Sequence, residues 1–143
     1  MTIRPRAARS VRDLRTRLRD IAAASHANTV AARDLSRIEL EDEQQEMARH
    51  LDGAHVTLAR AQSIYDLEMV DEDTGVHRLA IADATKKLEE TTKQTHVSEA
   101  ALRERARQLR AAEKLVERLE KGIATRETAN EQRANDDISA RRR

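Results

Sequence analysis

The sequence has no cysteine, phenylalanine or tryptophan, and only one tyrosine, one proline and three glycines in 143 residues. The lack of cysteine excludes disulfides, thiol chemistry and cysteine-based metal sites. Aromatic side chains normally supply much of the area of a globular core, so a chain whose only aromatic residue is Tyr65 does not predict a thick core. No apolar run approaches the ~20 residues of a membrane-spanning helix, and none near the N-terminus resembles a secretory signal. These absences predict a cytoplasmic protein without membrane insertion.

Five helix-favouring residue types dominate what is present. Ala, Glu, Lys, Leu and Arg account for 79 of the 143 residues, a share typical of long helices and coiled coils. The 27 basic and 26 acidic side chains nearly cancel. Because disordered chains usually carry a strong net charge, the balance favours a folded, all-α coiled coil.

Apolar and small residues recur at alternating spacings of three and four, which indicates a helical seam in each half of the chain. The first seam comprises Val11, Leu14, Leu18, Ile21, Leu35, Ile38, Met47, Leu51, Ala54, Leu58, Ala61 and Tyr65. The second comprises Ile81, Ala84, Leu88, Thr92, Thr95, Leu102, Ala106, Leu109, Ala112, Val116, Leu119 and Ile123.

A cluster of acidic residues followed by Gly75 separates the two seams. Asp73 or Thr74 would be a good N-cap, and the acids suit the positive end of a helix. We therefore predict one domain over residues 1–143, with helix 1 at about 6–70, a turn at about 71–75 and helix 2 at about 76–138.

Charge selects between a hairpin and a parallel dimer. A fold-back near residue 73 sets residue i opposite roughly residue 147 minus i, so the acidic residues within 39–46 would face the arginines of 103–110, and the basic residues 9–19 would face acids within 127–137. A parallel dimer would set the acidic block against its own copy. Because flanking charges select orientation in coiled coils, we predict a long two-helix antiparallel coiled-coil hairpin that is a monomer.

No residue pattern predicts catalysis. The closest histidines, His50 and His55, are five residues apart rather than the three or four that place two ligands on one helix face. The sequence contains no zinc-protease motif, phosphate loop or nucleophile elbow, and a two-helix coiled coil offers no enclosed pocket. We expect no enzymatic activity, no cofactor and no metal.

The N-terminal stretch is strongly basic, with seven arginines against Asp13 and Asp20 in residues 4–20. Positive charge opposes the dipole at a helix N-terminus, so helix stability does not explain it. The predicted fold brings Arg141, Arg142 and Arg143 to the same end. Three explanations stay open: a solvated tail, contact with nucleic acid or an anionic membrane, and docking into an acidic site on a protein. The lack of aromatic residues for base stacking argues against nucleic acid.

The chain resembles the FliJ/YscO family, the small coiled-coil component of flagellar and virulence-associated type III protein export. The resemblance rests on the length, the break between two helices, and two kinds of segment. The Ala- and Arg-rich first helix includes LSRIEL at 35–40 and LARA at 58–61, and the charged ending includes LVERLE at 115–120 and EQRANDDISAR at 131–141.

This resemblance implies a stalk that binds the hexameric export ATPase through the end holding both termini, and that contacts the export gate and secretion chaperones beside the inner membrane. The matching ATPase-end positions are Arg9, Arg12, Arg15, Arg17, Glu131, Arg133, Asp136 and Asp137. Tyr65 and Leu67 are mid-rod candidates for the gate, although family members usually have more aromatic residues. The alternative is a structural scaffold or tether in an unrelated assembly.

Overall fold

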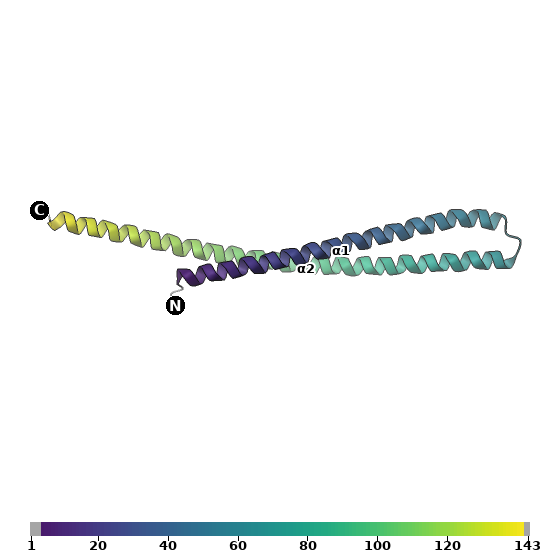
Figure 1. Ribbon diagram of the computed structural model, residues 1–143, viewed down its shortest axis with the longest axis horizontal. Helices are drawn as coiled ribbons and strands as arrows, with labels where there is room; N and C mark the ends of the chain where they lie inside the picture. The colour runs from purple at the N-terminus through teal and green to yellow at the C-terminus, as the bar shows by residue number, and fades with distance from the viewer. Residues whose placement is uncertain (1–3, 142–143) are drawn as a thin grey trace. The chain divides into compact units, whose positions relative to one another are not determined.

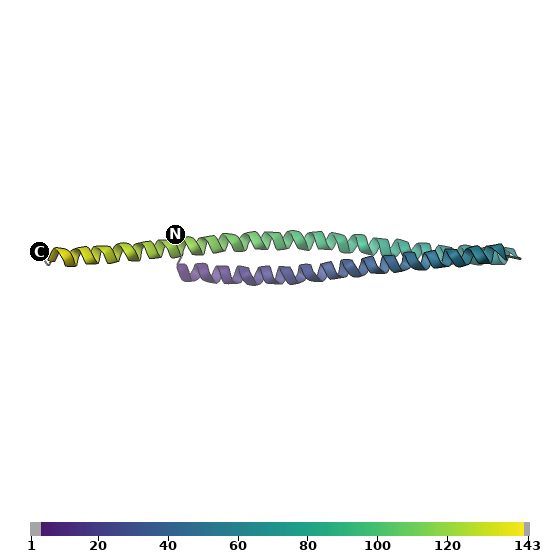
Figure 2. The ribbon, with the colours of Figure 1, turned by 90° about the horizontal axis from the view of Figure 1, so that it is seen from above.

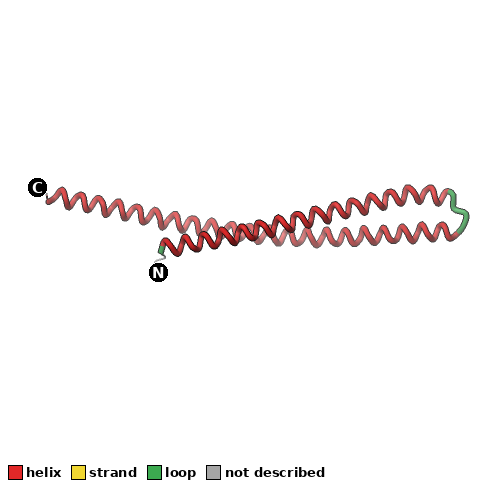
Figure 3. The backbone as a smooth tube through the Cα atoms, viewed as in Figure 1, coloured by secondary structure: helices red, strands yellow, loops and turns green. Residues whose placement is uncertain are grey.

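The computed structural model describes residues 4–141 and consists of two long helices, α1 (Pro5–Ala59) and α2 (Ile64–Arg141). They run antiparallel and pack against each other, joined by residues 60–63 (Figures 1 and 3). The predicted all-α, two-helix antiparallel hairpin is therefore confirmed. Pro5 opens α1, where its fixed φ suits the first helical turn and its missing N–H costs no hydrogen bond.

Contacts divide the chain into two units, which we describe separately. The hairpin unit is Ala24–Ala100 and contains the connection between the helices. The terminal unit is Met1–Ala23 together with Ala101–Arg143. One domain over residues 1–143 stays a prediction. Neither helix, over residues 4–141, is long and apolar enough to cross a membrane.

The connection lies at residues 60–63, so the predicted turn at 71–75 is wrong. The last turn of α1 tightens as the Arg60 N–H donates to the Thr57 carbonyl at 3.1 Å. The Asp66 N–H then donates to Ser63 Oγ at 3.4 Å, while Asp66 Oδ2 accepts from the Gln62 N–H at 3.1 Å. This reciprocal arrangement resembles a capping box, and it starts α2 without a glycine or proline.

Residues 71–75 lie inside α2 and are helical. Thr74 is buried, and its hydroxyl donates to the Val70 carbonyl at 2.7 Å. Gly75 has no positive φ, and an added Cβ would meet nothing within 4 Å. The glycine therefore marks no turn, and the observed helices replace the predicted boundaries of 6–70 and 76–138.

The earlier connection shifts the register of the whole pairing. Arg9 contacts Glu120, Glu39 contacts Lys87 and His50 contacts Thr74. The predicted register would have set Glu39 opposite residue 108 instead. The acidic block at 39–46 therefore does not face the arginines of 103–110, and the expected pairing of residues 9–19 with acids of 127–137 is wrong for the same reason.

The predicted seam of α2 faces inward. Ala84, Thr95, Leu109, Ala112 and Val116 are buried. The predicted seam of α1 is largely wrong in its first half, because Val11, Leu14, Ile21, Leu35 and Ile38 are exposed. Most of the residues of α1 that are buried or half-buried there belong to another stripe with spacings of three and four: Ala8, Arg12, Arg15, Arg19, Ala22, His26, Thr29, Arg33 and Ser36. Leu18 of the predicted seam is half-buried as well.

Packing explains why α1 turns this stripe, and not the predicted one, toward α2. In the terminal unit, α2 turns the large side chains of Leu109 and Val116 inward, and small residues such as Ala8 and Ala22 on α1 leave room for them. The arginines of the inward stripe can lay their aliphatic stems along the apolar contact and keep the guanidinium in water.

Candidate functional site

The two units carry opposite charge, which the near-neutral total conceals. The terminal unit has 19 basic and 10 acidic residues, and the hairpin unit has 8 basic and 16 acidic residues. The net charges are therefore +9 and −8. A surface that recruits an acidic partner is expected in the terminal unit, and this is the unit that holds all eight of the predicted ATPase-end residues.

The four predicted arginines of α1 differ in their surroundings. Arg9 reaches across to α2, where its Nη2 lies 2.9 Å from Glu120 Oε1. Arg12 pairs with its neighbour Asp13, also at 2.9 Å. Within residues 4–141, Arg15 and Arg17 form no ion pair or side-chain hydrogen bond. Their charge is therefore available to an external partner.

The four predicted residues of α2 lie in its last turns, beyond the part that α1 accompanies. Glu131, Arg133, Asp136 and Asp137 are all exposed. Figures 1 and 2 show α2 continuing past the start of α1. We call residues 124–141 the C-terminal extension; all of its residues are exposed except Ala129, which is half-buried. The structure therefore does not bring these four residues into contact with Arg9, Arg12, Arg15 or Arg17.

The C-terminal extension is a lone helix of 18 residues, roughly 27 Å long at 1.5 Å per residue. Its predicted charged partners on α1 are absent because the connection at 60–63 places Arg9 opposite Glu120. Of the three terminal arginines in the sequence, Arg141 ends α2, whereas Arg142 and Arg143 lie outside the described residues.

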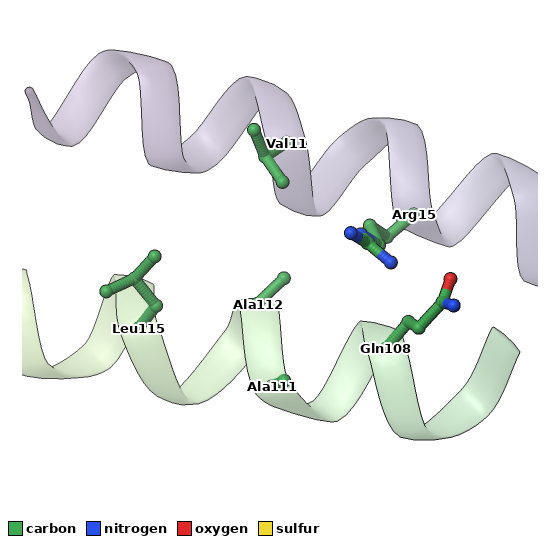
Figure 4. Close-up of a pocket in the computed structure, with 6 residues that line it drawn as sticks. All are labelled: Val11, Arg15, Gln108, Ala111, Ala112 and Leu115. Atoms are coloured by element: carbon green, nitrogen blue, oxygen red, sulfur yellow. The ribbon is translucent and has the colours of Figure 1, made fainter. Parts of the chain in front are cut away.

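An apolar groove runs between α1 and α2 in the terminal unit (Figure 4). Its volume is about 280 Å³, and it is lined by Val11, Arg15, Gln108, Ala111, Ala112 and Leu115. In Figure 4, Val11 and Arg15 from α1 point toward the side chains of α2. Arg15 is the only charged side chain in this lining.

The groove was not predicted from the sequence. Val11 was assigned to a buried seam and Arg15 to the ATPase end, whereas Ala111 was not singled out and Leu115 was noted only as part of the family resemblance. A usable signal existed: two stripes with the same spacing run along α1, and only one of them can face α2. Helical periodicity locates such stripes but does not choose between them.

Tyr65 and Leu67 lie in the first turn of α2, immediately after the connection, and not midway along the paired helices as predicted. Tyr65 is 67% exposed and Leu67 is 47% exposed. Tyr65 lines a cavity of about 440 Å³ with His50, Met69 and Asp73 among others. Leu67 lines a different one, of about 310 Å³, with Leu51 and Leu58. The two side chains thus line separate cavities at the closed end of the hairpin unit.

Polar layers replace apolar contacts at two levels of the hairpin unit. Ser98 Oγ lies 2.9 Å from His26 Nδ1 and 2.7 Å from Thr29 Oγ1, and Thr95 Oγ1 donates to the Thr29 carbonyl at 3.1 Å. Further along, the rings of His50 and His77 are 4.9 Å apart between centroids. The sequence did not predict these hydrogen bonds.

No catalytic or metal-binding arrangement emerges from the described residues. Groups of three or more side chains able to hold a metal are absent from residues 4–141. The pKa of Glu117 is lowered by a hydrogen bond from Lys121 and by the charges of Lys121, Arg118 and Lys114. Glu117 is exposed and pairs with Lys121 at a spacing of i, i+4, which is typical of a helix surface.

The family model described as Flagellar FliJ protein matches residues 7–143, nearly the whole chain. No curated protein and no solved structure matches the chain.

Proposed function

Since the chain belongs to the FliJ family and is thereby a component of the flagellar export apparatus, we propose that it is a non-enzymatic stalk that binds the hexameric export ATPase through its terminal unit. The observation that carries the proposal is the charge of this unit, which is +9 in total. Arg15 and Arg17 form no ion pair with any residue of 4–141, and the helical extension is exposed.

The mechanism is mechanical. A single helix is about 10–12 Å wide with its side chains, so the C-terminal extension can enter the centre of a ring of subunits. Loops of opposite charge in the ring would then hold the arginines of α1. One asymmetric chain contacts six equivalent subunits differently, and such a difference in interaction energy can bias which subunit closes on ATP. ATP hydrolysis itself belongs to the partner.

The hairpin unit supplies the second proposed contact. Tyr65 and Leu67 are exposed apolar side chains beside an acidic cluster that includes Asp66 and Asp71. Tyrosine is enriched at interface hot spots because it buries a large area at low entropic cost. We propose that the export gate binds this surface. Export chaperones are further partners that the family resemblance implies, and the stalk acts as a monomer in the cytoplasm.

Charge reversal tests the ATPase contact. We expect Arg15→Glu with Arg17→Glu to reduce stimulation of the purified export ATPase at least about tenfold, since each reversal replaces an attraction by a repulsion. The measurement is ATP turnover as a function of stalk concentration, at constant salt. Helicity by circular dichroism should stay within error, because neither arginine holds an ion pair within residues 4–141.

The matched control is Arg37→Glu with Arg60→Glu, two exposed arginines of the hairpin unit. It changes the net charge equally and should leave stimulation intact. If the two double variants stimulate the ATPase as well as each other and as well as the wild type, the stalk proposal is wrong and a structural scaffold or tether becomes the better explanation.

A further inference from the structure

The first turns of α1 carry an apolar stripe that is largely open to solvent: three of its four side chains are exposed, and Leu18 is half-buried. It consists of Val11, Leu14, Leu18 and Ile21, whose spacing places them on one helix face. Leu14 is 56% exposed and Ile21 is 66% exposed. These residues carry the strongest apolar pattern of α1, yet the contact with α2 is made by the other stripe, which includes Ala8 and Ala22.

The groove extends this apolar surface onto α2. Val11 belongs to both the stripe and the groove lining, and on α2 the lining continues with Ala111 and Leu115. Figure 4 shows Val11 on one side of the groove and the α2 residues on the other. The terminal unit therefore presents one apolar face built from two helices rather than a single isolated stripe.

Basic residues flank the apolar face on both helices. On α1, Arg6 and Arg17 lie along one edge of the stripe by their helical positions. On α2, Lys114 and Arg118 follow Ala111 at spacings of three and seven, so they share its side of the helix. These four side chains form no ion pair within residues 4–141, whereas Arg9, Arg12 and Arg19 are paired with acids.

We propose that this face docks the terminal unit onto an anionic lipid surface, with the helices lying in the plane of the headgroups. An apolar face with arginine and lysine along its edges is the chemistry of an interfacial helix. Basic residues near such a surface strengthen binding through their attraction to the anionic headgroups. Residues 4–23 contain seven arginines against two aspartates, and residues 101–121 contain seven basic against four acidic side chains.

Two features favour a lipid surface over other anionic partners. Nucleic acid would attract the arginines but would leave the aliphatic stripe exposed to water, and the chain has no Phe or Trp for base stacking. A single acidic helix in the groove would cover Val11 and Leu115, but the basic rows lie on the outer edges of both helices. A planar array of phosphates can reach both rows at once.

The docking differs from the ATPase contact proposed above because it needs the aliphatic side chains. The test is co-sedimentation of the full chain with vesicles of equal parts phosphatidylglycerol and phosphatidylcholine, and with vesicles of phosphatidylcholine alone. We expect binding to the anionic vesicles only. Leu14→Gln with Ile21→Gln should weaken this binding roughly tenfold or more, because both side chains lose apolar burial in the headgroup region.

The matched control is Leu79→Gln with Val97→Gln, two similarly exposed aliphatic residues of the hairpin unit, which should bind the vesicles as the wild type does. The Leu14 and Ile21 variant keeps every arginine, so it should stimulate the ATPase normally even where vesicle binding is lost. Equal binding to neutral vesicles, or unchanged binding by the Leu14 and Ile21 variant, would overturn the lipid proposal without affecting the stalk proposal. Binding by charge alone would show as a response to Lys114→Gln with Arg118→Gln but not to Leu14→Gln with Ile21→Gln, and this also overturns it.

Discussion

Some side chains in this protein are buried between the helices although their residue type is polar. Ser36 and Thr95 are among the most buried residues, yet both are small polar groups. The Ser36 hydroxyl donates a hydrogen bond to the Ala32 carbonyl at 2.9 Å. The Thr95 hydroxyl is within hydrogen-bonding distance of carbonyls on both helices. Buried polar atoms that are fully hydrogen-bonded cost little, so the hairpin unit tolerates them in place of aliphatic residues.

Gly75 allows the position of the connection to be tested with one methyl group. It lies inside α2 without a positive φ and with open space around the site of a Cβ. We expect Gly75→Ala to raise the free energy of unfolding by about 0.5–1 kcal/mol, since alanine is the better helix former by that amount. Urea unfolding followed by circular dichroism measures the change.

Gly53→Ala is the matched control, because Gly53 lies within α1 and is equally open. The two variants should gain similar stability. A loss of stability for Gly75→Ala alone would mean that residue 75 needs the backbone freedom of a turn, and the connection at residues 60–63 would then be incorrect.

At the scale of elements, the first turn of α2 is where a gate contact should be most sensitive. Tyr65 is the only aromatic side chain of the chain and lies 67% exposed at the start of this helix. We expect Tyr65→Ala to weaken binding to the purified cytoplasmic domain of the export gate by roughly 30-fold, the loss typical of a hot-spot residue of about 2 kcal/mol. Isothermal titration calorimetry gives the affinity.

Leu35→Ala provides the comparison, because Leu35 is exposed to a similar degree on α1 and should affect the affinity little. Equal losses in the two variants would show that exposed apolar area in general, and not the surface at the start of α2, mediates binding. No loss for Tyr65→Ala would remove this surface from the proposed gate contact.

The sequence predicted the elements well where one signal dominated. Composition and periodicity predicted two antiparallel helices, and the seam of α2 through Leu109 and Val116 is buried as expected. The connection was misplaced because acidic residues and Gly75 imitate a turn, whereas the actual signal, Ser63 and Asp66 at a spacing of three, is brief and contains no breaker. Every cross-helix pair depends on that position, so a single error displaced the whole register.

The candidate site was less predictable than the fold for a related reason. Arg15 and Arg17 could be identified as a basic group from the sequence alone, but their lack of an acidic partner depends on which α2 residues lie opposite. Likewise, Leu14 and Ile21 form a clear stripe in either register. Whether such a stripe is buried or exposed depends on how the two helices pair, and the sequence of one helix alone does not decide it.

At the scale of the whole molecule, the balance of charge predicts how copies of the chain interact. The terminal unit carries +9 and the hairpin unit −8, so the basic unit of one copy attracts the acidic unit of another. Salt screens such attractions over about 10 Å at 0.1 M and far less effectively at 0.01 M. We therefore expect a monomer of 16.2 kDa at physiological salt and a rising average mass as the ionic strength falls, measured by light scattering.

The direction of the salt effect separates this association from one through the apolar stripe of Val11, Leu14, Leu18 and Ile21. Apolar contacts between copies strengthen in salts that are excluded from protein surfaces, such as sulfate, whereas attraction between oppositely charged units weakens as ionic strength rises. A dimer that persists or grows in high sulfate, and that Leu14→Gln with Ile21→Gln dissociates, would contradict the monomer. It would also mean that a second copy, and not a lipid surface, covers the stripe.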